Sequence, residues 1–206
     1  MTRGKFITLE GMDGAGKSTH LNWIPGFLQA RGVSVKITRE PGGTPIGEKL
    51  RELMLDQNQH LHPDTEAMLM FAARREHLDK VILPALNAGV WVVCDRFTDA
   101  TFAYQAAGSG LPWARVSVLE SWVQGDLQPD LTLYFDVPSD VGKARTQAVR
   151  DPDRFEREGR SFFDRVREGY LQRARENPTR ISVIDATRQL TEIKSSVESV
   201  IISNCF

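Results

Sequence analysis

The sequence has 206 residues, of which 41% are hydrophobic and 26% are charged, and its formal net charge is −1 at pH 7. This composition is typical of a globular protein and excludes a disordered or fibrous chain. A net charge near zero gives no indication of a nucleic acid polymer or an anionic membrane as partner. No apolar run approaches the roughly 20 residues that cross a bilayer. Since no linker or repeat is visible, we expect a single domain over residues 1–206.

Two cysteines occur, Cys94 and Cys205, so no disulfide framework is indicated. The N-terminal segment lacks the apolar core of a secretory signal peptide. We therefore expect a soluble protein of the reducing cytoplasm.

Five short runs rich in apolar and β-branched residues predict strands, at residues 6–9, 33–38, 90–94, 131–137 and 181–184. They are nearly continuous in apolar residues, which is typical of strands covered on both faces. Helical patterns lie between them, at residues 18–31, 44–55, 64–87, 112–125, 139–148, 159–176 and 190–202. Because strands alternate with helices, we expect a three-layer α/β/α fold around a five-stranded parallel sheet.

A glycine-rich segment from Gly11 to Ser18, GMDGAGKS, matches the phosphate-binding pattern G-x-x-x-x-G-K-[ST]. It lies between the first predicted strand and the first predicted helix, which is the context such a loop requires. Glycines allow backbone N–H groups to converge on phosphate oxygens, and the helix N-terminus adds positive partial charge. In such loops the residue at Lys17 contacts the β- and γ-phosphates and the Ser18 hydroxyl ligates Mg²⁺. The sequence therefore predicts a nucleoside triphosphate site.

How the triphosphate is used depends on other motifs. A GTPase should carry Asn-Lys-x-Asp and a transporter-type ATPase Leu-Ser-Gly-Gly, and neither occurs. A small kinase is therefore the leading interpretation, and a nucleotide-dependent switch or binding module is the alternative.

Charged residues follow two of the predicted strands, where ligands of open α/β sheets bind. Asp95 and Arg96 follow the third strand, Arg39 follows the second, and Arg51 lies one helix further on. Asp95 is placed to hold Mg²⁺ through water, and the alternative is a solvated acid at a strand end. The arginines together favour an anion site, although each alone is more often a surface residue.

Phe71 and Arg75 lie four residues apart in a predicted helix and therefore share a face. A ring stacked on a base, with a guanidinium at the edge of that base, would suit a nucleotide acceptor. The alternative is that Phe71 belongs to the core and that Arg75 pairs with Asp79 or Glu76.

Together these motifs resemble the thymidylate kinase family, bacterial type, from about residue 5 to the last helix. The segments that carry the resemblance are residues 11–18, 38–43, 48–51, 70–75, 95–96, 103–105, 129–134 and 185–187. The resemblance implies a P-loop nucleoside monophosphate kinase with a mobile lid at about residues 142–160. It also implies transfer of the γ-phosphoryl group of ATP to dTMP with Mg²⁺, giving dTDP and ADP in dTTP biosynthesis, by a homodimer. A kinase for a deoxynucleoside or another monophosphate is the nearest rival.

The resemblance also implies an acceptor site. Its residues are Asp13, Arg39, Glu40, Arg51, Phe71, Arg75, Arg96, Thr101, Tyr104 and Gln105. Phe71 would stack on thymine, and Arg75 would bond its carbonyl edge. Thr101 and Gln105 would read the rest of that edge. Tyr104 would pack under the sugar, Asp13 would meet the 3′-hydroxyl region, and the remaining residues would surround the phosphate.

For ATP, the resemblance implies Gly11, Met12, Asp13, Gly14, Ala15, Gly16, Lys17, Ser18, Thr19, Arg145 and Arg188, with Ser18 and Asp95 for Mg²⁺. Because the phosphate of dTMP is mostly dianionic at pH 7, it needs positive charge and alignment rather than a general base. We expect Lys17, Arg96, Asp13 and Arg150 to be catalytic. Some members carry an arginine where this chain has Gly14, so the missing cation is assigned to the lid, to Arg150 first and Arg154 second.

Overall fold

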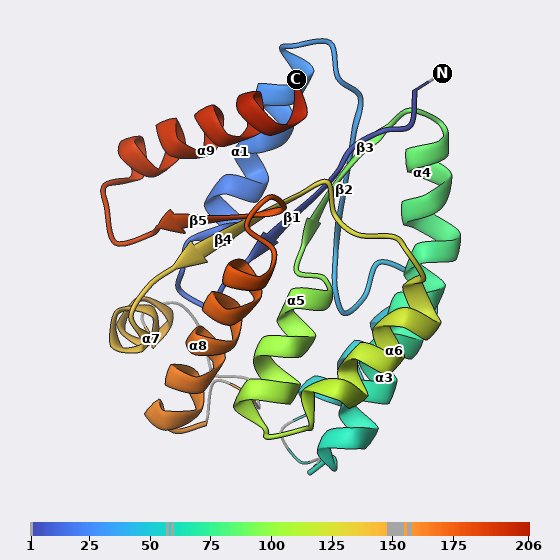
Figure 1. The fold of residues 1–206 in the computed structure, drawn as a ribbon, viewed down its shortest axis with the longest axis vertical. Coiled ribbons are helices and arrows are strands. Elements are labelled where there is room, and N and C mark those ends of the chain that lie inside the picture. Colours follow the sequence, from blue (N-terminus) through green and yellow to red (C-terminus); the bar gives the residue numbers. More distant parts are fainter. Residues whose placement is uncertain (1, 57, 59, 148–154, 156–157) are drawn as a thin grey trace.

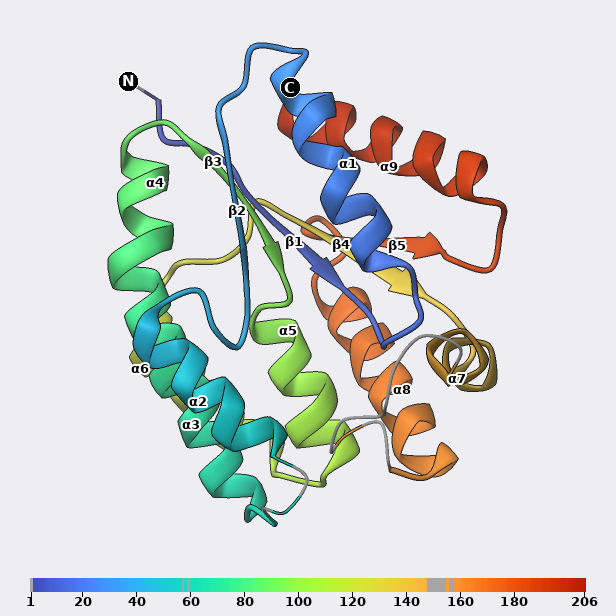
Figure 2. The same ribbon diagram turned by 180° about the vertical axis from the view of Figure 1, so that it is seen from behind.

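The computed structural model describes residues 2–56, 58, 60–147, 155 and 158–206. In this part of the chain five strands form one parallel sheet in the order β2-β3-β1-β4-β5. The strands are β1 (Phe6–Glu10), β2 (Val35–Arg39), β3 (Trp91–Asp95), β4 (Leu131–Asp136) and β5 (Ile181–Asp185). Helices cover both faces of the sheet (Figures 1 and 2), which confirms the predicted α/β/α fold.

The helices are α1 (Lys17–Gln29), α2 (Pro45–Leu55), α3 (Pro63–His77), η1 (Leu78–Ile82), α4 (Leu83–Asn87), α5 (Thr98–Thr101), η2 (Phe102–Gly108), α6 (Trp113–Gln124), α7 (Ser139–Gln147), α8 (Arg160–Glu176) and α9 (Leu190–Cys205). The segments η1 and η2 are π-helical. None of the described helices combines the length and the apolar character that crossing a bilayer requires.

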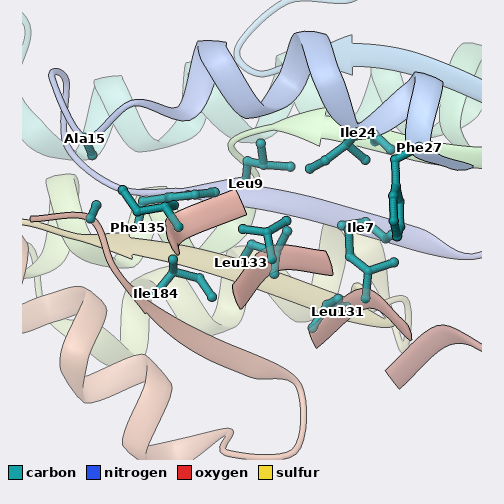
Figure 3. Packing of buried hydrophobic residues seen from close by; sticks show 14 of the residues in the cluster. Ile7, Leu9, Ala15, Ile24, Phe27, Leu131, Leu133, Phe135 and Ile184 are labelled. Carbon is teal, nitrogen blue, oxygen red and sulfur yellow. The ribbon is translucent and has the colours of Figure 1, made fainter. Parts of the chain in front are cut away.

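One face of the sheet packs against α1 and α9 (Figure 3). Ile7, Leu9 and Leu133 point from the central strands toward Ile24 of α1 and Val197 of α9, and all five side chains are completely buried. Alternate residues of the same strands face the opposite layer. There Phe6 and Val92 meet η1 and α4, and Tyr134 meets α8. The sheet is therefore covered on both sides, as its continuous apolar strands predict.

The helix over residues 98–108, formed by α5 and η2, is absent from the sequence-based prediction. Most of its residues are buried, so it has no polar face and no amphipathic pattern to detect. It packs between α8 on one side and α3 and α6 on the other. Gly169 of α8 allows the close approach, since a Cβ there would lie 2.7 Å from the Cβ of Ala107. This helix carries Thr101, Tyr104 and Gln105.

The topology brings three sequence motifs to one edge of the sheet. Leu9 of β1 and Arg39 of β2 are both in register with Asp95 of β3, so these strands end side by side. The phosphate loop follows β1, and Arg96 follows β3. Ligands of parallel sheets bind at such an edge.

Candidate active site

The phosphate loop (residues 11–18) requires glycine at its first position. Gly11 has φ +140°, and a Cβ there would lie 2.6 Å from the main-chain oxygen of Phe135 on the neighbouring strand. Gly16, with φ +88° in the left-handed region, is the N-cap residue of α1. The loop therefore passes close to the sheet and leads directly into the N-terminus of α1, as a phosphate site requires.

Lys17 lies in the first turn of α1 and is buried. Its Nζ donates to the main-chain oxygens of Gly11 at 2.8 Å and Met12 at 3.0 Å, and lies 3.8 Å from Asp13 Oδ1. Burial lowers the pKa of Lys17, and the nearby charge of Arg96 lowers it further. The ammonium therefore lies across the phosphate loop, where a phosphate oxygen would compete well for its hydrogen bonds.

Arg96 is held in an unusual backbone conformation, with φ +67° for a residue other than glycine. Its main-chain N–H donates to Leu9 O at 2.9 Å, and the next N–H, of Phe97, donates to Glu10 Oε1 at 2.6 Å. The guanidinium donates to Asp13 Oδ1 at 3.0 Å and lies over the ring of Tyr104. Such backbone strain is concentrated at functional sites, and here it directs a cation toward the phosphate loop.

Beneath Arg96 lies the fully buried carboxyl group of Glu10. Tyr170 of α8 donates its hydroxyl to Glu10 Oε2 at 2.9 Å and accepts from Arg96 Nη1 at 3.3 Å. Burial, and after it the neighbouring charge of Asp99, raises the pKa of Glu10 to about 8. Glu10 therefore connects β1, the segment after β3 and α8.

Beside the phosphate loop lies a cavity with about 620 Å³ of empty space, its open mouth included. This size suits a small-molecule ligand. Its lining residues come from the loop, from the segments after β2 and β3, and from α2, α3, α5, η2 and residue 155. They are Asp13, Glu40, Pro41, Arg51, Leu55, Met70, Arg74, Arg96, Phe97, Ala100, Thr101, Tyr104, Gln105 and Phe155.

Positive charge gathers at this cavity. Burial lowers the pKa of Arg51, and the nearby charges of Arg39 and Arg96 lower it further. Arg51 donates to Pro41 O at 3.0 Å and so lies against the segment after β2. A phosphate placed among these guanidinium groups would relieve their mutual repulsion.

Seven residues predicted for the acceptor line the cavity: Asp13, Glu40, Arg51, Arg96, Thr101, Tyr104 and Gln105. Arg39 is not among the lining residues. Its guanidinium is half exposed and pairs with Glu48 Oε2 at 2.8 Å, beside the cavity rather than in it.

The predicted base-contacting pair, Phe71 and Arg75, lies outside the lining of the cavity. Phe71 is buried in a core cluster that includes Phe102, and Arg75 is half exposed, donates to Val123 O at 3.0 Å and pairs with Asp79. The cavity is lined instead by Met70 and Arg74, one residue earlier. Both pairs have the same four-residue spacing, so spacing alone could not distinguish them. The orientation of α3 determines which of the two pairs lines the cavity.

Arg74 is 2% exposed, and its Nη1 is buried without a hydrogen-bond partner among the described residues. Its Nε donates to Glu40 Oε2 at 2.8 Å and its Nη2 to Thr101 Oγ1 at 3.1 Å. A buried unpaired donor at a cavity wall points to a ligand acceptor. The sequence offered one signal for this residue, namely that Arg74 also lies in the α3 segment that carries the family resemblance.

Asp95 ends β3 with a similar feature. Its Oδ1 is buried and has no hydrogen-bond partner in the part of the chain that the structure describes. Mg²⁺ prefers carboxylate oxygens and water, and commonly takes one or two carboxylates together with phosphate oxygens. With the Ser18 hydroxyl at the start of α1, the residues present fit such an ion.

Arg145 of α7 donates to Ala186 O at 3.0 Å and to Gly14 O at 3.4 Å, so it links the phosphate loop to the segment after β5. Arg188, in that segment, pairs with Asp185 and is exposed. Both arginines therefore lie on the α7 side of the phosphate loop. Arg150 and Arg154 lie outside the described residues, as does much of the predicted lid.

Comparison with known proteins places this arrangement in a family. The family model for thymidylate kinase matches residues 9–197. A thymidylate kinase from Nitrosomonas europaea is 61% identical over 201 residues, which cover 98% of this chain and 94% of the relative. One from Nitrosospira multiformis is also 61% identical, over 97% of each chain.

A crystal structure of thymidylate kinase from Ehrlichia chaffeensis has the same fold, with a TM-score of 0.78 and 34% identity over 97% of this chain and 99% of that one. The chain therefore belongs to the thymidylate kinase family and is a nucleoside monophosphate kinase.

Proposed function

We propose that the chain transfers the γ-phosphoryl group of ATP to dTMP, giving dTDP and ADP in the route to dTTP. The observation that carries this proposal is the cavity beside the phosphate loop, which is lined by the guanidinium groups of Arg51, Arg74 and Arg96. Among the described residues, the buried Nη1 of Arg74 has no hydrogen-bond partner. A nucleoside monophosphate has a matching distribution of groups: a dianionic phosphate at one end and a base with carbonyl acceptors at the other.

On the donor side, residues 11–19 bind the phosphates of ATP, and Lys17 contacts those that separate during transfer. Ser18 and Asp95 would hold Mg²⁺, which supplies charge neutralisation between the two phosphate chains when it is bound. Arg145 and Arg188 border the adenine. Their position beside the loop and the segment after β5 supports this role.

On the acceptor side, Arg51 and Arg96 bind the phosphate of dTMP, and Arg39 adds positive charge beside the cavity. Arg74 bonds a carbonyl of the base, and Met70 packs against its face in place of Phe71. Tyr104 lies under the sugar, and Asp13 meets the 3′-hydroxyl region. Glu40 takes part by holding Arg74.

The transfer itself needs alignment and charge more than proton abstraction, since the attacking phosphate is already anionic. We assign Lys17 and Arg96 to stabilising the transferring group, with Asp13 orienting Arg96. In this proposal the chain is a single domain, and residues 142–160 act as its lid. Arg150 is the catalytic cation that this lid adds to the site.

We further propose that the protein works as a homodimer in the cytoplasm. Large apolar side chains are exposed on α2, α3 and α6, which pack side by side (Figure 2). They include Ile46, Met68, Val118 and Trp122. Both cysteines are free thiols, which suits a reducing compartment.

A coupled assay of ADP release tests the proposed function. With Mg²⁺ and ATP, dTMP should give the highest kcat/KM in a panel with dUMP, dCMP and thymidine. Faster turnover of any other acceptor would reassign the substrate. ATP binding without dTDP formation would favour a nucleotide-gated binding module.

A further inference from the structure

Behind the cavity wall lies a buried carboxyl group that the proposed reaction does not use. Glu66, in the first turn of α3, is 3% exposed and does not line the cavity. Its Oε1 accepts a hydrogen bond from Gln105 Nε2 at 2.6 Å. Gln105, from η2, is 1% exposed and does line the cavity, so it lies between Glu66 and any ligand.

This contact fixes which way round the amide of Gln105 is held. A carboxylate oxygen only accepts hydrogen bonds, whereas an amide has a donating nitrogen and an accepting oxygen on the same carbon. Turning the amide over would set its carbonyl against the carboxylate in a buried place, which is costly. Glu66 therefore holds the amide nitrogen of Gln105 and leaves the carbonyl oxygen as an acceptor for a ligand.

Arg74, another residue of the cavity wall, supplies hydrogen-bond donors rather than an acceptor. Its Nε is held by Glu40, and its Nη2 donates to Thr101, which lies four residues before Gln105. The cavity wall thus combines a hydrogen-bond donor, Arg74, with an acceptor, the carbonyl oxygen of Gln105. Arg74 is oriented by the buried carboxylate of Glu40, and Gln105 by that of Glu66. A thymine ring has a carbonyl acceptor next to an N–H donor and matches this pattern. Cytosine has an amino donor next to a ring-nitrogen acceptor and opposes it at both positions.

We propose that Glu66 is a positioning residue that selects an imide base over cytosine by fixing the amide orientation of Gln105. This inference rests on the proposed function and adds a residue that determines its base specificity. Glu66 acts through Gln105 and touches no reacting group.

The test compares kcat/KM for dTMP and dCMP in the full-length enzyme and in Glu66→Gln. The amide introduced by Glu66→Gln can either accept or donate a hydrogen bond, so it no longer fixes the orientation of the Gln105 amide. The ratio of the two kcat/KM values should fall about 10-fold or more, mainly through a higher KM for dTMP, with the KM for ATP unchanged. Glu76→Gln is the matched control: Glu76 lies on the same helix, is partly exposed and pairs with Lys80.

A double-mutant cycle separates positioning from a general structural role. In a Gln105→Ala background, Glu66→Gln should not change the ratio further. An unchanged ratio in a folded Glu66→Gln variant, or the same fall without Gln105, would overturn the proposal. If Glu66→Gln does not fold, Glu66→Asp draws the acceptor back by one carbon and should lower the ratio in the same direction; an unchanged ratio there also overturns it. A wild-type enzyme without preference for dTMP would instead overturn the proposed function and, with it, this inference.

Discussion

Arg74 Nε donates a 2.8 Å hydrogen bond to Glu40 Oε2 at the cavity wall, where both side chains are almost fully buried. His77, one turn later on α3, lies with its Nδ1 3.0 Å from Glu40 Oε1, and its Nε2 lies 2.6 Å from Thr38 Oγ1. Glu40 thus ties the segment after β2 to α3. A guanidinium held in this way is oriented before a nucleotide arrives, which reduces the entropy lost on binding.

The first prediction compares two neighbouring arginines. Arg74→Lys keeps a positive charge beside Glu40 but cannot bond Glu40, Thr101 and a base carbonyl together. We expect the KM for dTMP to rise about 10- to 100-fold, because a charge-assisted hydrogen bond is lost, while the KM for ATP stays within about twofold. Steady-state kinetics with each substrate varied measure both values.

Arg75→Lys is the control for this prediction, because Arg75 bonds Val123 O at the surface. We expect nearly wild-type kinetics. If Arg75→Lys raises the KM for dTMP and Arg74→Lys does not, the sequence-based pair was the right one.

The contrast between these arginines shows what the sequence could and could not predict. The phosphate loop is a local motif, and its glycines, lysine and serine act through their own backbone and first helical turn. The parallel sheet follows from alternating apolar runs. In contrast, Phe71 and Arg75 have the same spacing as Met70 and Arg74. The packing of α3 against α2, α6 and η2 determines which pair faces the cavity.

Long-range pairing sets a second limit. Gln105 is recognisable as a candidate from the family resemblance, but its partner Glu66 is 39 residues away along the chain. The helix that carries Gln105 is buried on most sides, so its sequence has no hydrophobic period. The contact with Glu66 becomes visible only when α3 and η2 are placed together.

The second prediction concerns Asp95. Asp95→Asn removes the negative charge of a carboxylate whose Oδ1 has no described hydrogen-bond partner. The Mg²⁺ concentration for half-maximal turnover should rise about 10-fold or more, as is typical when a residue that supports a metal is changed. A magnesium titration at saturating ATP and dTMP measures it. The exposed Asp126→Asn serves as control, and an unchanged titration of Asp95→Asn would place the metal elsewhere.

The third prediction concerns Glu10 and pH. Its pKa is raised to about 8 in the folded protein, so between its ordinary range and pH 8 the folded state binds more protons than the unfolded state. The contribution of Glu10 to the free energy of unfolding should therefore fall as pH rises through this window, by at most about 1.4 kcal/mol per pH unit.

Urea unfolding of the wild type and Glu10→Gln from pH 5 to pH 9 measures this contribution. The stability of the wild type relative to Glu10→Gln should fall with pH and level off above about pH 8. If the free energy of unfolding of the wild type instead rises with pH relative to that of Glu10→Gln, the ionised form of Glu10 is favoured in the folded protein. The hydrogen bonds donated by Phe97 N–H and Tyr170 O–H would then outweigh the effect of burial.

The fourth prediction contrasts two helical glycines. Gly26 is exposed in α1, and a Cβ there meets nothing within 4 Å, so Gly26→Ala should stabilise the protein by about 0.5–1 kcal/mol. Gly169→Ala places a Cβ 2.7 Å from the Cβ of Ala107 and should destabilise it. Denaturant unfolding compares both variants, and a stable Gly169→Ala would show that α8 can shift away from η2.

The last prediction concerns self-association through α6. Trp122 is 82% exposed, and Val118, one turn earlier, is 66% exposed, so this helix presents an apolar face that a second copy of the chain would cover. A two-fold interface would contain Trp122 twice, so Trp122→Arg should weaken dimerisation by about 2 kcal/mol or more. Sedimentation velocity over a concentration series should show a dimer for the wild type and a monomer for Trp122→Arg. Leu190→Arg, an equally apolar exposed position at the start of α9, should leave the dimer intact. If only the α9 variant dissociates, the dimer uses the opposite side of the molecule.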